Sequence, residues 1–387
     1  MMKKRVFNIL FMLGLVLLAA CSGSDQASKE LGVDVGDESG SISDEGPIVI
    51  GSILPLTGDA ASIGQNTQTA IELAVEHIND AGGIDGRNLE VIFEDGKCTA
   101  QQAANAAQKL VNVDQVPVII GGLCSSETLA AAPIAEDGKT VMFSMCSSSP
   151  DVTDAGDFIF RDYPSDAFQG SKAAEIALEK LGAKKAAVLY CLSDWCVGIR
   201  DVFRKDFPSV GGEIVAEEAY EQTAKDLRTQ LTKIKEAEPD LIYFVGYTEA
   251  SIVGLKQAKE LGIEAQMLGA DAWDDRTIHE QAGDAAEGIV YIHPYAPLTD
   301  KFKAAMEAKT GSSELTICSP QAYDAVNIVA GIMKRVGAEG ERVKDELYKV
   351  KDYQGVSGPI TIDENGDLST ANYAVKIVKN GEAVEFE

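Results

Sequence analysis

The alternation of short apolar runs with helical segments most limits how this chain can fold. Runs that predict β-strands lie at residues 48–54, 89–93, 116–120, 141–143, 186–190, 213–219, 241–245 and 266–269. The segments between them carry apolar residues at helical spacing, a pattern typical of βαβ units around a parallel sheet. Because the strands are apolar on both faces, we expect helices to cover both sides of the sheet.

The length of this region predicts two lobes. It runs from about residue 47 to residue 387, and a domain usually holds about 150 residues. The chain closes with two helical segments and two strands, at residues 320–336, 342–349, 359–362 and 374–378. We therefore predict an α/β fold with two doubly wound parallel-sheet lobes.

The first 20 residues have the pattern of a secretory signal peptide. A basic start precedes an apolar run over residues 6–20, which is shorter than the roughly 20 apolar residues of a transmembrane helix. The run ends at Cys21 in a sequence that resembles a lipobox, so we expect cleavage after residue 20 and a lipid on Cys21. A signal peptide without lipidation would need no cysteine there.

Residues 21–46 are expected to form a lipidated flexible tether. The stretch after Cys21 is rich in Ser, Gly, Asp and Glu, and it cannot bury enough apolar surface to offset the entropy of ordering. We expect an exported protein that is lipid-anchored at the cell envelope, in the periplasm or on the outer face of a membrane.

The charge balance and the missing motifs exclude several classes of function. A formal net charge of −27 argues against nucleic acid as a partner, because phosphate contacts need Lys and Arg. With only three histidines and no CxxC motif, the sequence does not predict a metal site or a cofactor. Nucleotide-binding and hydrolase motifs are also absent from the sequence, which favours binding over catalysis.

Polar side chains gather after two strands of the first predicted lobe. Ser125 and Ser126 follow a Gly-Gly pair, and Ser147 and Ser148 follow the next strand along the chain. Ligands of open α/β sheets bind beyond the carboxyl ends of the strands, and helix N-termini there favour anions. These serines predict an anion site, although helix capping is the alternative for each cluster.

The loops of the second predicted lobe offer aromatic rings and one acid. Trp195 lies between two cysteines, Tyr247 follows the strand at 241–245, and Asp271 follows the strand at 266–269. The rings suit an apolar lid, or an anchor that holds the loop to the core. Asp271 is placed to meet an ammonium group, although a helix cap is again the alternative.

Several motifs, in this order and spacing, resemble the branched-chain amino-acid-binding (Leu/Ile/Val) family of type I periplasmic solute-binding proteins, which serve ABC transporters. They are Ile50-Gly51 through Leu56-Thr57-Gly58, Asn79 to Ile84, Gly121 to Ser126, Gly283 to Gly288, and Ser357-Gly358-Pro359 through Asp363. The resemblance implies two lobes joined by a three-segment hinge. It places the N-terminal lobe at 47–166 plus 294–372 and the C-terminal lobe at 167–293 plus 373–387.

The resemblance also implies roles for single residues. Ser125 and Ser148 are similar to the hydroxyls that hold a ligand carboxylate, and Cys146 and Ser147 are similar to neighbouring backbone contacts. Asp271 stands where the leucine-type members have a glutamate that pairs with the ligand ammonium. Trp195 and Tyr247 resemble the aromatic residues that close over the ligand, and Ile63 stands where another aromatic residue often lies.

The six cysteines left after Cys21 allow 15 pairings, and spacing does not choose among them. The family pattern implies Cys98–Cys124, proximity favours Cys191–Cys196, and Cys146–Cys318 follows by elimination.

We therefore predict a non-enzymatic lipoprotein that binds an amino acid between its lobes and delivers it to ABC permease subunits. The alternatives are a ligand-sensing accessory lipoprotein, a secreted α/β enzyme, or a binding protein for a small amide or carboxylate.

Overall fold

Short, mostly buried strands form the first lobe, which is built around a five-stranded parallel sheet. The structure is a computed structural model that describes residues 46–312 and 315–386. The sheet order is β2-β1-β3-β4-β5, and every neighbouring pair is parallel. The strands are β1 (Ile48–Leu54), β2 (Leu89–Asp95), β3 (Val118–Gly121), β4 (Val141–Ser144) and β5 (Ile159–Arg161).

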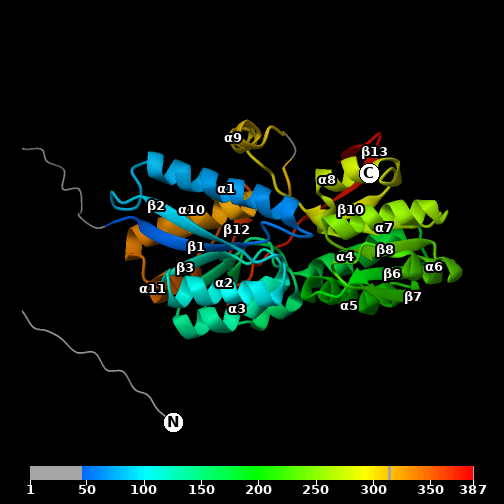
Figure 1. The fold of residues 1–387 in the computed structure, drawn as a ribbon, viewed down its shortest axis with the longest axis horizontal. Coiled ribbons are helices and arrows are strands. Elements are labelled where there is room, and N and C mark those ends of the chain that lie inside the picture. Colours follow the sequence, from blue (N-terminus) through cyan, green and yellow to red (C-terminus); the bar gives the residue numbers. More distant parts are fainter. Residues whose placement is uncertain (1–45, 313–314, 387) are drawn as a thin grey trace, which may run out of the picture. The chain divides into compact units, whose positions relative to one another are not determined.

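Helices cover both faces of this first sheet (Figure 1). One face packs against α1 (Ala61–Asp80), α10 (Ser319–Val336) and α11 (Gly340–Leu347), and the other against α2 (Ala100–Asn112) and α3 (Ser125–Gly138). On β1, Ile50 joins the core beneath α1 and α10, whereas Ile53 joins the core beneath α2 and α3. Successive side chains of a strand point to opposite faces, and both faces of β1 meet a core, which explains why the strand is apolar on both sides.

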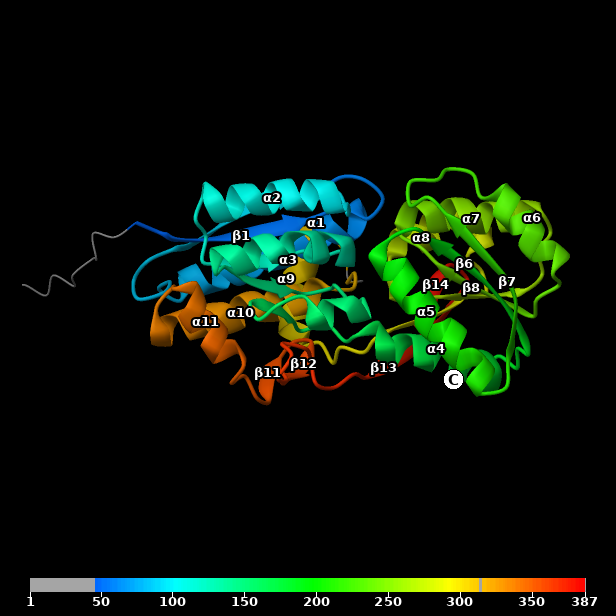
Figure 2. The same ribbon diagram turned by 90° about the horizontal axis from the view of Figure 1, so that it is seen from below.

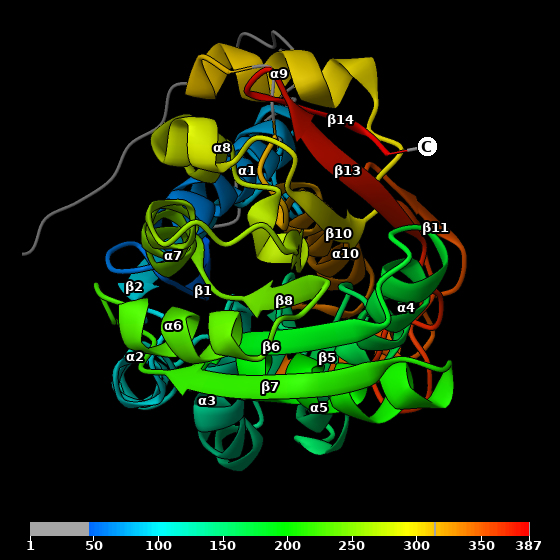
Figure 3. The ribbon, with the colours of Figure 1, turned by 90° about the vertical axis from the view of Figure 1, so that its right-hand side faces the viewer.

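The second lobe is built on a seven-stranded sheet of order β14-β13-β10-β9-β8-β6-β7 (Figure 3). Its strands are β6 (Lys185–Cys191), β7 (Glu213–Tyr220), β8 (Leu241–Val245), β9 (Gln266–Gly269), β10 (Val290–Pro294), β13 (Tyr373–Lys379) and β14 (Glu382–Glu385). Its helices are α4 (Asp166–Glu179), α5 (Asp194–Ser209), α6 (Arg228–Glu236), α7 (Thr248–Glu260) and α8 (Arg276–Ala282).

The second sheet is mixed, which differs from the wholly parallel sheet that we expected. β13 runs antiparallel to both β10 and β14. β13 and β14 are joined by Asn380 and Gly381, which both have positive φ angles. A two-residue turn of this kind returns the chain beside itself and therefore makes the two strands antiparallel.

The chain passes between the two sheets three times (Figure 2). The crossings lie between β5 and α4, between β10 and α9 (Asp300–Thr310), and between β13 and the hairpin of β11 (Tyr353–Gly355) and β12 (Gly358–Ile360). We propose that the lobes divide at these crossings, with limits at 47–166 plus 294–372 and at 167–293 plus 373–387.

Three disulfides tie down loops at the carboxyl ends of the strands. They join Cys98 to Cys124, Cys191 to Cys196 and Cys146 to Cys318, which are the pairs expected from the sequence. Among the helices that the structure describes, none combines the length and the apolar character needed to cross a bilayer. The predicted signal peptide, Cys21 and the tether lie outside the described residues.

Candidate ligand-binding site

A small cavity lies where loops from the two sheets meet. Its volume is about 20 Å³. It is lined by Ile63, Leu123, Cys124, Ser125, Cys146, Ser148, Trp195, Tyr247, Asp271, Ala272 and Ile317. Six of the eight residues that the sequence predicted for ligand binding are therefore brought together, although they come from segments that follow five different strands.

The serines that open α3 do not cap it, which removes the alternative explanation for them. Ser125 and Ser126 are the first two residues of the helix, and Cys124 occupies the capping position. The Oγ atom of Ser125 accepts a hydrogen bond from the backbone N–H of Ser149 at 3.1 Å. That bond leaves the O–H group of Ser125 able to donate into the cavity, beside the positive end of the helix.

Ser126 lies outside the cavity lining and joins the two lobes instead. Its Oγ atom accepts a hydrogen bond of 3.2 Å from the backbone N–H of Asp194, the first residue of α5. The second lobe therefore contacts the first helix turn of α3 directly.

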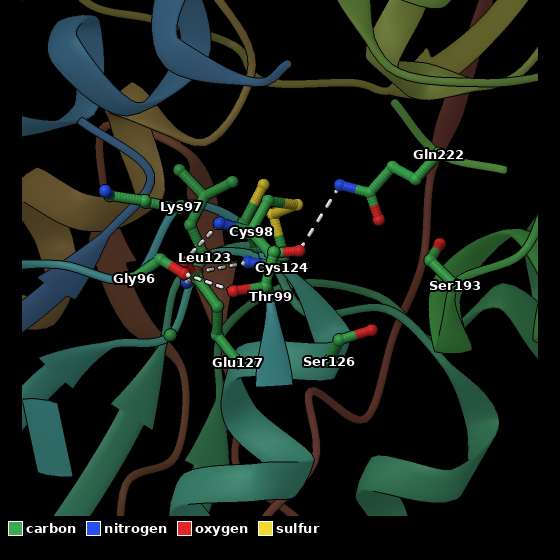
Figure 4. Close-up of a disulfide and its surroundings, with 12 residues drawn as sticks. Gly96, Lys97, Cys98, Thr99, Leu123, Cys124, Ser126, Glu127, Ser193 and Gln222 are labelled. Carbon is green, nitrogen blue, oxygen red and sulfur yellow. Dashed lines mark hydrogen bonds between the residues drawn. A yellow bond between two sulfur atoms is a disulfide. The ribbon is translucent and has the colours of Figure 1, made fainter. Parts of the chain in front are cut away.

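A buried carboxylate and a disulfide hold the loop before α3 in place (Figure 4). Glu127 accepts backbone hydrogen bonds of 2.9–3.0 Å from Cys98, Leu123 and Cys124. Burial raises the pKa of Glu127 to about 7, while the backbone N–H groups act in the opposite direction. Gly96 permits this close approach, because a Cβ atom there would lie 2.2 Å from Glu127 Oε1.

Of the two predicted serines after β4, one bonds within the first lobe and the other lines the cavity. Ser147 lies outside the cavity lining, and its Oγ atom bonds to Thr128 Oγ1 at 2.6 Å and to the carbonyl of Gly122 at 3.0 Å. Ser148 lines the cavity, and its hydroxyl donates to Asp166 Oδ2 at 2.9 Å. The side chain of Cys146 is bonded to Cys318, which fixes this loop to the start of α10.

Two aromatic rings form the wall that the second lobe contributes. Trp195 and Tyr247 are 4 % and 5 % exposed, and their ring centroids lie 4.7 Å apart. Cys196, the residue after Trp195, is bonded to Cys191, so the loop that presents the indole is closed covalently. The pair can cover an apolar group while remaining rigid.

Asp271 is the acidic group of the cavity. Its Oδ2 atom accepts a hydrogen bond of 2.7 Å from the Tyr163 hydroxyl, and its Oδ1 atom accepts one of 3.0 Å from the backbone N–H of Ala272. It begins a 3₁₀ turn without occupying the capping position, which is held by Ala270. Burial raises the pKa of Asp271 to about 6.

Further polar contacts join the two lobes. Ser62 Oγ donates to Asp275 Oδ1 at 3.1 Å, and Gln222 Nε2 donates to the carbonyl of Cys98 at 3.3 Å (Figure 4). Lys225 lies 3.4 Å from Asp59. The two lobes are therefore in direct contact in this structure.

Sequence reasoning missed several residues of the site. Leu123, Cys124, Ala272 and Ile317 line the cavity, and Tyr163 and Asp166 bond to residues that line it. Tyr163 and Asp166 belong to the first crossing, where no strand-end pattern marks them. Within the described residues, no group of three or more His, Cys, Asp or Glu side chains could hold a metal ion.

Comparisons with known proteins match nearly all of the body of the chain. The family model described as "Periplasmic binding protein" matches residues 47–382. A leucine-, isoleucine-, valine-, threonine- and alanine-binding protein of Pseudomonas aeruginosa is 32% identical over 331 residues, which cover 83% of this chain and 87% of the relative.

Two solved structures resemble this one along most of its length. The branched-chain amino acid transporter substrate-binding protein of Streptococcus pneumoniae, solved with isoleucine, has a TM-score of 0.81 and 30% identity, covering 87% of this chain and 97% of that one. An ABC-transporter solute-binding protein of Rhodopseudomonas palustris, solved with 3,4-dihydroxybenzoic acid, has a TM-score of 0.78 and 27% identity, covering 88% and 97%.

Proposed function

The chain belongs to the periplasmic binding protein family, and from that premise we propose that it captures an α-amino acid between its lobes and delivers it to an ABC importer. The family is one of exported binding proteins and not of enzymes. An amino acid needs far more room than about 20 Å³, which is close to the space of one water molecule. The lobes must therefore separate to admit a ligand.

The observation that carries this proposal is the buried carboxylate of Asp271 at the cavity. It is 3 % exposed, and no basic side chain of the described residues forms an ion pair with it. A buried carboxylate without a counter-charge is costly, and a ligand ammonium would supply that charge.

The first lobe is suited to the opposite end of the same ligand. The hydroxyl of Ser125 is free to donate, and it lies at the start of α3, a helix of 14 residues. Donors and a helix N-terminus favour a carboxylate. A zwitterion would then bridge the lobes and bind their closed arrangement more tightly than the open one, which is the condition for driving closure.

Ser148 is better suited to the ammonium than to the carboxylate that the family resemblance implied. A hydroxyl has one proton to donate, and Ser148 donates it to Asp166 Oδ2 at 2.9 Å. The lone pairs that remain can accept a hydrogen bond from an ammonium. Ser148 and Asp271 would thus contact the same end of the ligand.

The remaining walls favour an apolar ligand side chain. Ile63, Trp195, Tyr247 and Ile317 surround the cavity and offer apolar contacts to a ligand side chain. We expect branched or small apolar amino acids to bind best, with discrimination between neighbouring side chains of about 1–3 kcal/mol per methylene group.

A ligand screen tests the proposal. The twenty amino acids, short amides and substituted benzoates would be compared by thermal shift, because binding to the folded state raises stability with ln(1 + [L]/Kd). We expect apolar amino acids to raise the melting temperature. Stabilisation by benzoates alone would favour the alternative function, since those ligands carry no ammonium and the relative solved with 3,4-dihydroxybenzoic acid shares this fold.

We also propose that a lipid on Cys21 anchors the protein and that residues 22–46 act as its tether. The basis is the signal-peptide pattern followed by a polar, acidic segment. Cys21→Ser should release the protein from membranes while its melting temperature stays unchanged. Mass spectrometry that finds an unmodified Cys21 at the mature N-terminus of the wild type would refute the anchor.

A further inference from the structure

A second buried carboxylate, Asp166, is hydrogen-bonded to Ser148, which lines the cavity. It is the first residue of α4 and is fully buried. Its backbone N–H donates to the carbonyl of Ser148 at 2.7 Å, and its Oδ2 atom accepts from the Ser148 hydroxyl at 2.9 Å. Its Oδ1 atom is buried and has no hydrogen-bond partner among the described residues. Asp166 is thus fixed against a residue that lines the cavity, with half of its carboxylate unsatisfied.

The groups around Asp166 do not provide a free positive charge. The titratable and charged side chains that interact electrostatically with Asp166 are Asp271, Arg161, Tyr163, Tyr243, Tyr247 and Tyr373. Arg161 is the one cation among them, and both of its contacts to Asp367 are 2.7 Å long. It also donates to the carbonyl of Ser149 at 2.9 Å. The guanidinium is therefore already paired with Asp367.

We propose that Asp166 is a second positioning carboxylate of the ammonium site, and that it forms with Asp271 a pair for which a proton and the ligand ammonium compete. This inference rests on the proposed function. It implies that capture of an amino acid releases a proton to solvent. It also implies that Asp166 favours ligands with an ammonium over aromatic carboxylates, which carry none.

The physical reason is charge balance in a buried space. Two neighbouring carboxylates cannot both ionise there without a counter-charge, so in the absence of ligand one proton neutralises part of the pair. An arriving ammonium supplies one positive charge, the pair gives up its proton, and the total charge of the site stays the same. Burial and Asp271 raise the pKa of Asp166 well above its ordinary value, and burial raises that of Asp271 to about 6. Both shifts favour retention of a proton on the pair while no ligand is bound.

Calorimetry can count the released proton. L-Leucine, L-isoleucine, L-valine and L-alanine would be titrated into the full-length protein at pH 7 in buffers of different ionisation enthalpy. The slope of the observed enthalpy against buffer enthalpy gives the number of protons. We expect the wild type to release up to one proton when it binds an amino acid. As the pH rises from 5 to 7, its Kd should fall by up to about tenfold per pH unit.

Asp166→Asn separates this role from a purely structural one. Asparagine mimics the protonated acid and can still accept the hydrogen bond from Ser148. We expect the variant to lose the proton release and to bind at least tenfold more weakly at pH 7.5. A merely structural, permanently neutral Asp166 would show neither change.

Asp162→Asn is the matched control on the same crossing. Asp162 is also buried, its carboxylate oxygens also lack hydrogen-bond partners in the described part of the chain, and its charged neighbour is Asp324. It does not line the cavity. The control should keep the proton release of the wild type.

Two results would overturn the inference. Amino-acid binding without proton release, with a Kd that is flat from pH 5 to 7, would leave the proposed function standing and remove the role of Asp166. A flat wild-type pH profile refutes the role of Asp166 even if a variant fails to fold. Failure of every amino acid to bind would remove the proposed function and the inference together.

Discussion

Asp271→Asn tests the charge that the second lobe presents to a ligand, because asparagine keeps the shape of the side chain and removes its charge. The amide oxygen can still accept from the backbone N–H of Ala272, which lies 3.0 Å from Asp271 Oδ1. The Tyr163 hydroxyl, 2.7 Å from Oδ2, can turn to accept from the new amide group. The variant should therefore fold and retain the local geometry.

The expected loss of affinity is large and is common to all amino acids. Removing one partner of a buried charge pair costs about 2–5 kcal/mol. This corresponds to a Kd about 30 to 5,000 times higher. Because every amino acid carries the ammonium, the loss should be similar for each side chain.

Without ligand, the Asp271→Asn variant should be more stable than the wild type. Its stability should thus rise although its affinity for the ligand falls. Burial raises the pKa of Asp271 from 3.8 to about 6, so the folded state binds more protons than the unfolded state between these values. The free energy of unfolding therefore falls as pH rises through this range, by up to about 3 kcal/mol. Asparagine avoids that loss, and the gain in stability should be present at pH 7.5 and vanish near pH 4.

Calorimetry with two ligands that share a carbon skeleton isolates the contribution of the ammonium group to affinity. Leucine should lose affinity in Asp271→Asn, whereas 4-methylpentanoate, which lacks the ammonium, should not. Asp284→Asn is the control, because Asp284 belongs to the same lobe and its side chain is 98% exposed. Undiminished affinity for leucine in Asp271→Asn would show that the ligand is not held by an ammonium at this residue.

Three further outcomes can be checked. Trp195→Ala should shift preference toward larger side chains by about 10- to 200-fold without a uniform loss, measured across an amino-acid panel, since the indole walls the cavity. Glu127→Gln should lower the free energy of unfolding by about 1–3 kcal/mol in urea, because the carboxylate accepts three backbone N–H bonds. Replacing Cys146 and Cys318 by serine should lower the free energy of unfolding by about 5 kcal/mol in the chain-entropy model, because the disulfide closes a loop of 172 residues. Replacing the Cys98–Cys124 pair, which closes a loop of 26 residues, should lower it by about 3.5 kcal/mol. Equal losses would contradict that ranking.

The parallel parts of the fold could be predicted from the sequence because their signals are local. Strands buried on both faces are apolar throughout, and β1, with Ile50 on one face and Ile53 on the other, is an example. Some elements were not predicted. β5 has three residues, which is too few to show a period, and β10 carries His293 and Tyr291, which weaken an apolar run.

The sequence was sufficient to locate the site, but it did not identify all of the residues that line it. Strand ends pointed to Ser125, Ser148 and Asp271, because parallel strands bring their carboxyl ends to one edge of a sheet. The sequence could not separate Ser147 and Ser126 from the serines that line the cavity. Neighbouring hydroxyls have the same local pattern, and only their partners across the chain distinguish them.

The sequence by itself determined the fold class, the strand ends that supply the site and the residue types that suit a zwitterion. Only the tertiary structure decided which way the Ser148 hydroxyl donates, because its partner Asp166 lies 18 residues away on the first crossing. It also brought Tyr163 to Asp271 across 108 residues of chain. Hydrogen-bond direction and shared burial depend on groups that meet only when the lobes are folded together, so no local pattern in the sequence can encode them.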